Sequence, residues 1–331
     1  MDLKGPQHSV ELSATPDAAT ALDTAALVAL QAPSVHNTQP WHWQVSIDRI
    51  ELYADERWRL KVADPDGRLL VLSCGAALHH ARVALRAMRY QPAVHRFPDP
   101  HQPHLLARVT VDRPIPESER TQELMRAALS RQTDRRPFTD SPLPEPVAAA
   151  LRQAANSEGV WLHLLNLEQT RVLLAAAERA ENVEFAEPGY RRELAAWTGR
   201  PDGATEGVPS TALPPRGNGH QTTGSYAALY GSGDRPASWL RAGEALSTVW
   251  LNAIAHGLAI QPVSSVIEVP AARAVLHRML SGIGSPYLVL RIGIPATDTT
   301  TGLTPRGAAH ESVQVDSPAD EAAVAAMEVQ A

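Results

Sequence analysis

The sequence contains a single cysteine, Cys74, and no apolar run that approaches the ~18 residues of a membrane-spanning helix. One cysteine excludes a framework of internal disulfides. Residues 1–17 are polar and lack the apolar core of a secretion signal, so we expect the protein to work in a reducing cytoplasm. The net charge of -6 argues against nucleic acid or an anionic membrane as a partner.

Patterns typical of a metal site or of an activated nucleophile are also missing from the sequence. His79 and His80 are adjacent within a helical segment, so they cannot share one helix face as metal ligands normally do, and we expect them to be exposed or half-buried. Cys74 has no evident base partner and is expected to be a small core residue. The Gly-rich stretch GNGHQTTG at 217–224 has no lysine and follows no predicted strand, so it is not interpreted as a phosphate loop.

What the sequence does contain is an ordinary globular composition, with 44% apolar and 20% charged residues in a chain of 331. A chain of this length is expected to form about two domains. Helical spacing of the apolar residues predicts helices over 17–32, 73–90 and 238–257. Alternating apolar residues predict a hairpin over 41–55, and the continuous apolar run at 286–294 predicts a buried strand.

The two halves of the chain follow the same order of predicted elements. Each has a helix, a strand, a long helix that opens with Gly-x-Ala-Leu, and a closing strand. A repeat of this size indicates tandem domains rather than a solenoid. We expect a disordered N-terminus at 1–18, a first half at 19–115, a second half at 116–310 and a flexible tail at 311–331. The Gly- and Pro-rich segment 199–236 is the candidate for a lid.

Neutral hydrogen-bonding side chains crowd the corner between the first predicted helix and the hairpin, in the stretch APSVHNTQPWHW at 32–43. Pro33 and Pro40 stiffen the backbone there. The amides and hydroxyls offer both donors and acceptors, which suits a flat ligand with carbonyls and ring nitrogens, or a polyol chain. The alternative is that they only cap carbonyl groups at the end of the helix. These side chains are Ser34, Asn37, Thr38 and Gln39.

A second polar cluster, RQTDRRPF at 131–138, follows the predicted helix at 119–130. Its arginines and its threonine suit a bound anion, because guanidinium groups hold phosphate through two parallel hydrogen bonds and a hydroxyl adds one more. The alternative is a solvated basic turn that pairs with Asp134 and Asp140.

These stretches resemble signatures of the FMN-dependent nitroreductase superfamily. APSVHNTQPWHW is similar to its Pro-Ser-x-x-Asn-x-Gln-Pro-Trp motif, and RQTDRRPF looks like its companion basic segment. GLAIQPVSS, PYLVLRIG and LTPRG stand where that family has a late flavin contact, its last core strand and a phosphate-binding arginine. The resemblance covers roughly residues 20–310, and the length and doubled layout are similar to the Acg-like subgroup.

The resemblance implies an α+β fold in which two similar units intertwine. Ordinary members of that family are homodimers with FMN in each of two interface clefts. One subunit gives the basic segment of a cleft and its partner gives the Pro-Ser-x-x-Asn corner. The doubled layout then implies two tandem half-domains that form an intertwined pseudo-dimer within one chain.

The resemblance also assigns cofactor contacts, and it implies neither a catalytic side chain nor a metal. The phosphate and ribityl contacts would be Arg131, Thr133, Arg135 and Arg306. The opposite side of the flavin would be lined by Pro33, Ser34, Asn37 and Gln39. The flavin edge near its reactive nitrogen would be approached by Pro262, Ser264 and Ser265, in a loop where the family often has an acidic residue and a glycine.

Each half lacks a motif that the other half retains. Residues 1–18 contain no arginine, and the second half has NSEGVWLHLL at 156–165 where the first half has its corner. A cleft of a two-fold dimer takes one motif from each unit, so these two losses leave one complete cleft. We therefore expect one FMN per chain, bound between the halves.

The reaction implied by the resemblance is hydride transfer from NAD(P)H through FMN to a nitroaromatic, a quinone or a similar small acceptor. The alternative is a catalytically idle protein that stores or sequesters FMN, because a tightly closed lid would keep nicotinamide away from the flavin. We expect a monomer or a weak homodimer, since the fusion already satisfies the interface of the ancestral dimer.

Overall fold

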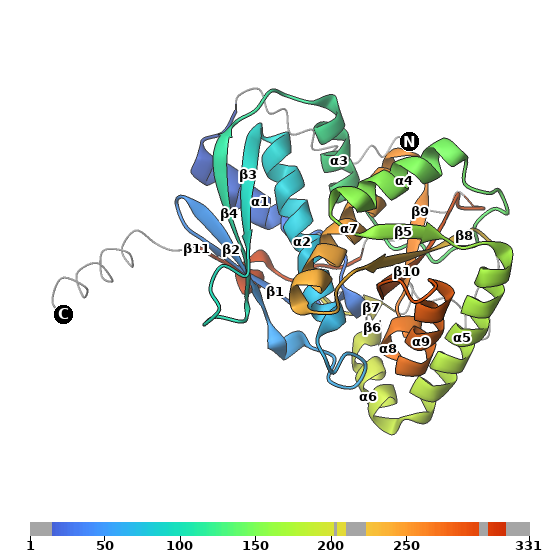
Figure 1. Cartoon of the computed structure of the whole chain (residues 1–331). Helices are drawn as coiled ribbons and strands as arrows, with labels where there is room; N and C mark the ends of the chain where they lie inside the picture. Colours follow the sequence, from blue (N-terminus) through green and yellow to red (C-terminus); the bar gives the residue numbers. More distant parts are fainter. Residues whose placement is uncertain (1–14, 202–203, 210–222, 298–303, 316–331) are drawn as a thin grey trace, which may run out of the picture.

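The computed structural model describes residues 15–201, 204–209, 223–297 and 304–315. Two mainly antiparallel sheets lie on either side of a central pair of long helices, α2 (Arg68–Ala87) and α7 (Pro236–Ala255) (Figure 1). Each sheet is built mainly from one half of the chain, so the molecule has the α+β architecture expected from the sequence.

The first half forms a five-stranded sheet in the order β11-β1-β2-β4-β3. Its first helix begins where the Asp17 carboxylate accepts a hydrogen bond from the Thr20 amide at 2.8 Å. Trp41 and Trp43 point to the same face of β1 and are at most 1% exposed, so this strand buries one face. The elements are α1 (Ala18–Ala29), a 3₁₀ turn (Val35–Asn37), β1 (Trp41–Val45), β2 (Arg49–Ala54), a 3₁₀ turn (Glu56–Trp58), α2, β3 (Tyr90–Arg96) and β4 (Leu105–Pro114).

The second half forms a four-stranded sheet in the order β5-β8-β10-β9, and its last strand crosses back to the first half. Its elements are α3 (Glu119–Ser130), α4 (Glu145–Ser157), β5 (Trp161–Leu164), α5 (Leu167–Ala186), α6 (Pro188–Trp197), β6 (Thr198–Arg200), β7 (Val208–Pro209), β8 (Ser225–Gly231), α7, β9 (Ala259–Val263), α8 (Ser265–Glu268), α9 (Pro270–Met279), β10 (Ser285–Gly293), α10 (Ala309–Ser312) and β11 (Val313–Val315).

Both sheets have the same strand order. In each half the strands run first, second, fourth, third across the sheet, and the long helix joins the second strand to the third. The second half carries an insertion from α5 to β7 between its first two strands, where the first half has only a short turn. The order of elements thus agrees with the internal repeat predicted from the sequence.

The two central helices cross at glycines that occupy corresponding positions. A Cβ atom on Gly75 of α2 would lie 2.0 Å from the carbonyl oxygen of Leu240, and one on Gly243 of α7 would lie 1.9 Å from that of Leu72. Each glycine opens one of the two Gly-x-Ala-Leu sequences. The contact is therefore reciprocal, and only glycine permits this separation of the two backbones.

A buried strand lies within the segment 199–236, which the sequence analysis treats as a loop and candidate lid. Strand β8 pairs with both β5 and β10, and Tyr226 within it is only 2% exposed. The loop prediction is wrong for β8, because a strand buried on both faces shows no alternation and flanking glycines and serines conceal it. Residues 210–222 of the candidate lid lie outside the described residues.

The ends of the chain are partly folded, in contrast to the prediction. Residues 15–18 lead into α1, and the Tyr90 hydroxyl donates a hydrogen bond to the Pro16 carbonyl at 2.8 Å. The flexible tail predicted at 311–331 is wrong for β11, which pairs in parallel with β1. The remainder of both ends lies outside the described residues.

His79 and His80 are buried between α2 and α7 rather than exposed or half-buried as predicted. The Ser247 hydroxyl lies 2.8 Å from Nδ1 of His79 and 3.0 Å from Nδ1 of His80. Burial, with positive charge nearby, holds the pKa of both histidines well below the usual range. Cys74 is buried, as expected.

Within the described ranges, no helix is both long and apolar enough to cross a bilayer. The same residues bring together no group of three potential metal-ligating side chains.

Candidate functional site

The corner between α1 and β1 is held in an unusual backbone conformation. His36, Asn37 and Gln39 all have positive φ angles, of 43°, 57° and 52°. Non-glycine residues adopt this conformation at an energetic cost that neighbouring interactions must offset. Here the Ser34 hydroxyl oxygen accepts a hydrogen bond from the Gln39 amide at 2.9 Å, and the Ser73 hydroxyl oxygen accepts one from the Val35 amide at 3.1 Å.

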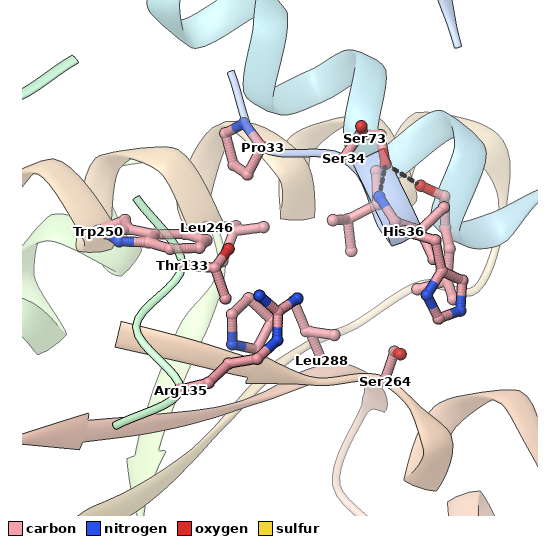
Figure 2. A pocket seen from close by; sticks show the side chains of 14 residues that line it. Pro33, Ser34, His36, Ser73, Thr133, Arg135, Leu246, Trp250, Ser264 and Leu288 are labelled. Atoms are coloured by element: carbon pink, nitrogen blue, oxygen red, sulfur yellow. Dashed lines mark hydrogen bonds between the residues drawn. The ribbon is translucent and has the colours of Figure 1, made fainter. Parts of the chain in front are cut away.

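This corner forms one wall of a cavity of about 620 Å³ between the two halves. Figure 2 shows Pro33, Ser34 and Ser73 on one side of the cavity, with Arg135 and Ser264 on the opposite side. The described residues that line it are Pro33, Ser34, Val35, His36, Leu69, Leu72, Ser73, Thr133, Arg135, Leu246, Trp250, Pro262, Ser264 and Leu288. Leucines, prolines and a tryptophan form much of this lining, so we call it the apolar compartment.

A second cavity of about 410 Å³ shares part of its lining with the apolar compartment. The residues common to both are Pro33, Ser34, His36, Thr133 and Arg135. The residues that line only the second cavity are Asn37, Arg131, Val208, Pro209, Thr304 and Arg306. We call it the arginine compartment, and the two compartments form one cleft.

Arg131 carries its guanidinium into the arginine compartment without a carboxylate partner in the described chain. Its side chain is 3% exposed, and its guanidinium carbon lies 4.7 Å from the centre of the Trp250 ring. Nη2 donates to the Gln31 carbonyl at 3.4 Å, whereas Nε and Nη1 are buried and have no hydrogen-bond partner among the described residues. Burial and the charge of Arg306 lower the pKa of Arg131 well below its usual value.

Arg306 converges on the same point from the C-terminal segment. Its Nη2 donates to the Gln31 carbonyl at 2.9 Å and its Nη1 donates to Oδ1 of Asn37 at 2.6 Å. Burial lowers the pKa of Arg306 to about 10, and its buried Nε has no partner in the described part of the chain. Two guanidiniums that face the same compartment, with no carboxylate paired to either among the described residues, create a site that favours an anion.

The basic segment divides between the two interpretations made from the sequence. Thr133 and Arg135 line both compartments, as expected for a ligand-binding segment. Arg136 instead pairs with Asp134, with Nη2 and Oδ2 2.5 Å apart, and so follows the alternative of an internally paired basic turn.

Nine of the eleven residues predicted to contact a cofactor line the cleft, and Gln39 and Ser265 do not. In its side chain, Gln39 Nε2 donates to the Thr205 carbonyl at 3.0 Å, and Oε1 accepts from the Gly307 backbone amide at 3.1 Å. Gln39 therefore fastens two distant segments to the corner. Ser265 starts helix α8. Asn37 and Arg131, which the resemblance places on opposite sides of one bound flavin, line the same compartment.

Several lining residues were not predicted as site residues. His36 lines both compartments, and burial together with the positive charge of Arg135 lowers its pKa to about 4, so its ring is neutral near pH 7. The residue type alone did not indicate that His36 would occupy a left-handed turn. Leu246 and Trp250 lie three and seven positions after Gly243, the crossing glycine of α7, and this spacing was the available signal.

Comparison with known proteins identifies relatives along most of the chain, although no profile of a known protein family matches it. "Putative NAD(P)H nitroreductase Rv3131" from Mycobacterium tuberculosis (strain ATCC 25618 / H37Rv) is 36% identical over 301 residues, covering 84% of this chain and 86% of the relative. "Putative NAD(P)H nitroreductase acg" from the same strain is 29% identical over 307 residues, covering 86% of this chain and 92% of the relative.

Solved structures of nitroreductases are similar to part of the chain. The FMN- and NADPH-dependent nitroreductase NfnB from a sphigopyxis strain has a TM-score of 0.43 and 18% identity, over 59% of this chain and 99% of that one. NfnB from Mycobacterium smegmatis in complex with NADPH has a TM-score of 0.43 and 16% identity, over 60% and 100%. The family assignment depends on the curated relatives, which match most of the sequence: the chain belongs to the NAD(P)H nitroreductase family.

Proposed function

We propose that this chain binds one FMN in the cleft between its halves and transfers a hydride from NAD(P)H to a nitroaromatic, a quinone or a similar acceptor. The observation that carries this proposal is a pair of arginines, the buried Arg131 and the half-buried Arg306, at one end of a cleft whose other end is lined in part by leucines, prolines and a tryptophan. A ligand with a dianionic phosphate at one end and a flat ring system at the other matches both ends.

The arginine compartment fits the phosphate of FMN. Nε and Nη1 of Arg131 and Nε of Arg306 are buried donors without partners in the described chain. Unpaired buried charges and donors are costly, and a phosphate removes both costs because its oxygens accept several charge-assisted hydrogen bonds. The hydroxyl of Thr133, at the junction of the two compartments, suits the ribityl chain.

The apolar compartment fits the ring of FMN. Leu72, Leu246 and Leu288 bring apolar side chains to its lining, and Pro33 and Ser34 line it as well. FMN, when bound, supplies the two-electron chemistry that connects NAD(P)H to the acceptor, while the protein supplies binding, orientation and electrostatics. The neutral ring of His36 adds a polar group to this wall without adding a charge.

If the internal repeat had kept two flavin sites, the second would lie at the first-half positions that correspond to the cleft residues of the second half. The residues at those positions support the proposal of a single site. Gly243 and Gly75 are 243 - 75 = 168 positions apart, and the same shift relates Gly257 to Arg89, which both have left-handed backbones with φ of 71° and 70°. Applied to the cleft, this shift pairs Trp250 with Arg82 and Ser264 with Arg96.

Charged side chains occupy this corresponding position. Glu244, which is 0% exposed, accepts hydrogen bonds from Arg82 Nη1 and Arg96 Nε at 2.7 Å each. Arg82 also pairs with Glu158, which lies in the short connection between α4 and β5. A paired ion cluster in place of a tryptophan and a serine leaves no apolar wall for a second flavin ring.

The test is the flavin content of the purified protein, measured from its visible spectrum after denaturation. We expect one FMN per chain in the wild type and a loss of bound FMN in Arg131→Ala, because two of the three unpartnered donors disappear. Arg126→Ala, on the exposed face of the preceding helix α3, is the matched control and keeps its flavin. Two flavins per chain, or full FMN content in Arg131→Ala, would refute the proposal.

A second candidate function, FMN storage without turnover, is favoured by one contact. The described residues 204–209 of the candidate lid cross the corner, where the Gly207 amide donates to the Asn37 carbonyl at 3.2 Å. Val208 and Pro209 line the arginine compartment. Anaerobic mixing with NADH or NADPH separates the two functions: bleaching of the flavin indicates the enzyme, and bleaching by dithionite alone indicates storage.

A further inference from the structure

Residues 304–307, which we call the C-terminal arm, carry Arg306 into the arginine compartment and are docked on side chains of both halves. On the second half, Oε1 of Gln132 accepts hydrogen bonds from the Thr304 backbone amide at 2.9 Å and from the Thr304 hydroxyl at 2.7 Å. Gln132 directly follows Arg131, but it is not among the described residues that line the two compartments. The turn that brings Arg131 to the cleft therefore also anchors the arm that brings Arg306 there.

The first half holds the other end of the arm through the corner between α1 and β1. Nδ2 of Asn37 donates to the Pro305 carbonyl at 3.0 Å. Oε1 of Gln39 accepts from the Gly307 backbone amide at 3.1 Å. The arm itself belongs to neither a helix nor a strand and is only half-buried, so its docking depends largely on these few side-chain hydrogen bonds.

Docking of the arm also has an unfavourable electrostatic consequence. It places Arg306 beside Arg131, and their guanidiniums donate to the same Gln31 carbonyl, at 2.9 Å and 3.4 Å. Like charges held at one acceptor repel each other. A dianionic phosphate that accepts hydrogen bonds from both guanidiniums offsets this repulsion, so an anion favours the docked arm.

We propose that Gln132 is a positioning residue, which docks the C-terminal arm so that Arg306 meets the phosphate of FMN, and that FMN binding in turn strengthens the docking. This inference rests on the proposed function. The coupling is reciprocal: whatever FMN adds to the docking of the arm, the docked arm adds to the affinity for FMN. β11 pairs with β1 beyond the arm, so the arm can leave the cleft while the chain after it stays attached.

The coupling is tested without any turnover, by hydrogen exchange of the Thr304 and Gly307 backbone amides, which donate to Gln132 and Gln39. We expect saturating FMN to slow the exchange of both amides by about tenfold, within the usual range for coupled binding events. Riboflavin has the same ring and ribityl chain but no phosphate, and should leave both amides at their flavin-free rates. The amides of the buried strand β10 are the control and exchange slowly in every sample. No protection by FMN, or equal protection by riboflavin, would overturn the coupling.

The role of Gln132 is tested by the FMN affinity of Gln132→Met, which keeps the length of the side chain and removes its acceptor. We expect the dissociation constant to rise by about tenfold, because both hydrogen bonds to Thr304 are lost. Gln153→Met, on the exposed face of α4, is the matched control and binds FMN as the wild type does. In the Arg306→Ala background the same substitution of Gln132 should have little further effect, because Gln132 acts through Arg306.

The possible outcomes separate this inference from the proposed function. Wild-type affinity in Gln132→Met, or an equal loss with and without Arg306, would refute the positioning role. A wild-type protein that binds one FMN but leaves the arm amides unprotected contradicts only the coupling. A wild-type protein that binds no FMN contradicts the proposed function as well.

Discussion

Arg131 places a guanidinium without a carboxylate partner in the described chain in the protein interior, at the site where we propose that FMN binds. The ring of Trp250 lies against its guanidinium and offsets part of the cost of burial. The Gln31 carbonyl accepts from both Arg131 and Arg306, so the two like charges are held close together. Sites that bind charged ligands often reduce the stability of the empty protein in this way.

Substitution of this arginine should therefore have opposite effects on stability and on flavin binding. We expect Arg131→Met to raise the unfolding free energy of the flavin-free protein by about 1–2 kcal/mol, since a buried unpaired charge is replaced by an apolar chain of similar length. With excess FMN, the wild type should be the more stable of the two proteins, because only the wild type gains stability from binding. Thermal unfolding with and without FMN measures both effects. Arg126→Met is the control, and a lower stability of Arg131→Met without FMN would contradict the argument.

At the residue scale, the sequence predicted which stretches line the cleft better than it predicted the contacts of each residue within them. The corner and the basic segment were both identified, and most of their named residues line the cleft. The sequence did not show that Asp134 pairs with Arg136, whereas Arg135 lines the cleft. Gln39 was misplaced because its positive φ angle turns its side chain toward Thr205 and Gly307.

The central helices determine how closely the two halves approach. Their crossing brings α7 residues such as Trp250 opposite α2 residues such as Leu72 across one cleft, so the width of the cleft depends on the crossing distance. The glycines at the crossing have backbone atoms of the opposite helix against them, and backbone cannot rotate aside as a side chain can.

Addition of one methyl group at the crossing should thus destabilise the protein strongly. We expect Gly75→Ala and Gly243→Ala each to destabilise the protein by about 3 kcal/mol or more, because the helices must separate and core contacts on both sides are lost. Gly189→Ala in α6 is a suitable control, since its Cβ would meet mainly side-chain atoms at 3.1 Å or more. Urea denaturation measures the differences. If Gly75→Ala lost no more unfolding free energy than Gly189→Ala, the result would show that the helices can readjust.

Elements with a clear local pattern were predicted, among them β10 in the apolar run at 286–294, whereas β8 and β11 were not. The ranges predicted from the helical spacing of apolar residues overlap α2 and α7 over most of their lengths. β8 is only seven residues long and lies within a Gly-rich stretch. Its strand character comes from pairing with β5 and β10 on either side, which no local pattern records.

At the scale of the whole molecule, the C-terminal segment connects the halves a second time. Gly307 donates to Gln39, Arg306 lines the arginine compartment, and β11 extends the sheet of the first half beside β1. The sequence predicted the role of Arg306 through the resemblance but treated 311–331 as a tail. Three residues are too few to form a recognisable strand, and β11 is defined only by the exposed edge that it covers.

Two truncations should separate the roles of this segment. A chain that ends at residue 308 keeps Arg306 and Gly307 but lacks α10 and β11. We expect it to bind FMN and to aggregate more readily, because the edge of β1 is uncovered. A chain that ends at residue 303 also lacks the arginine and should lose most of its flavin. Flavin content and light scattering of the two proteins measure these outcomes, and the point variant Arg306→Ala in the full chain is the control. If the shorter chain retained its flavin, the anion site would need Arg131 alone, and the C-terminal segment would serve only to hold the two sheets together.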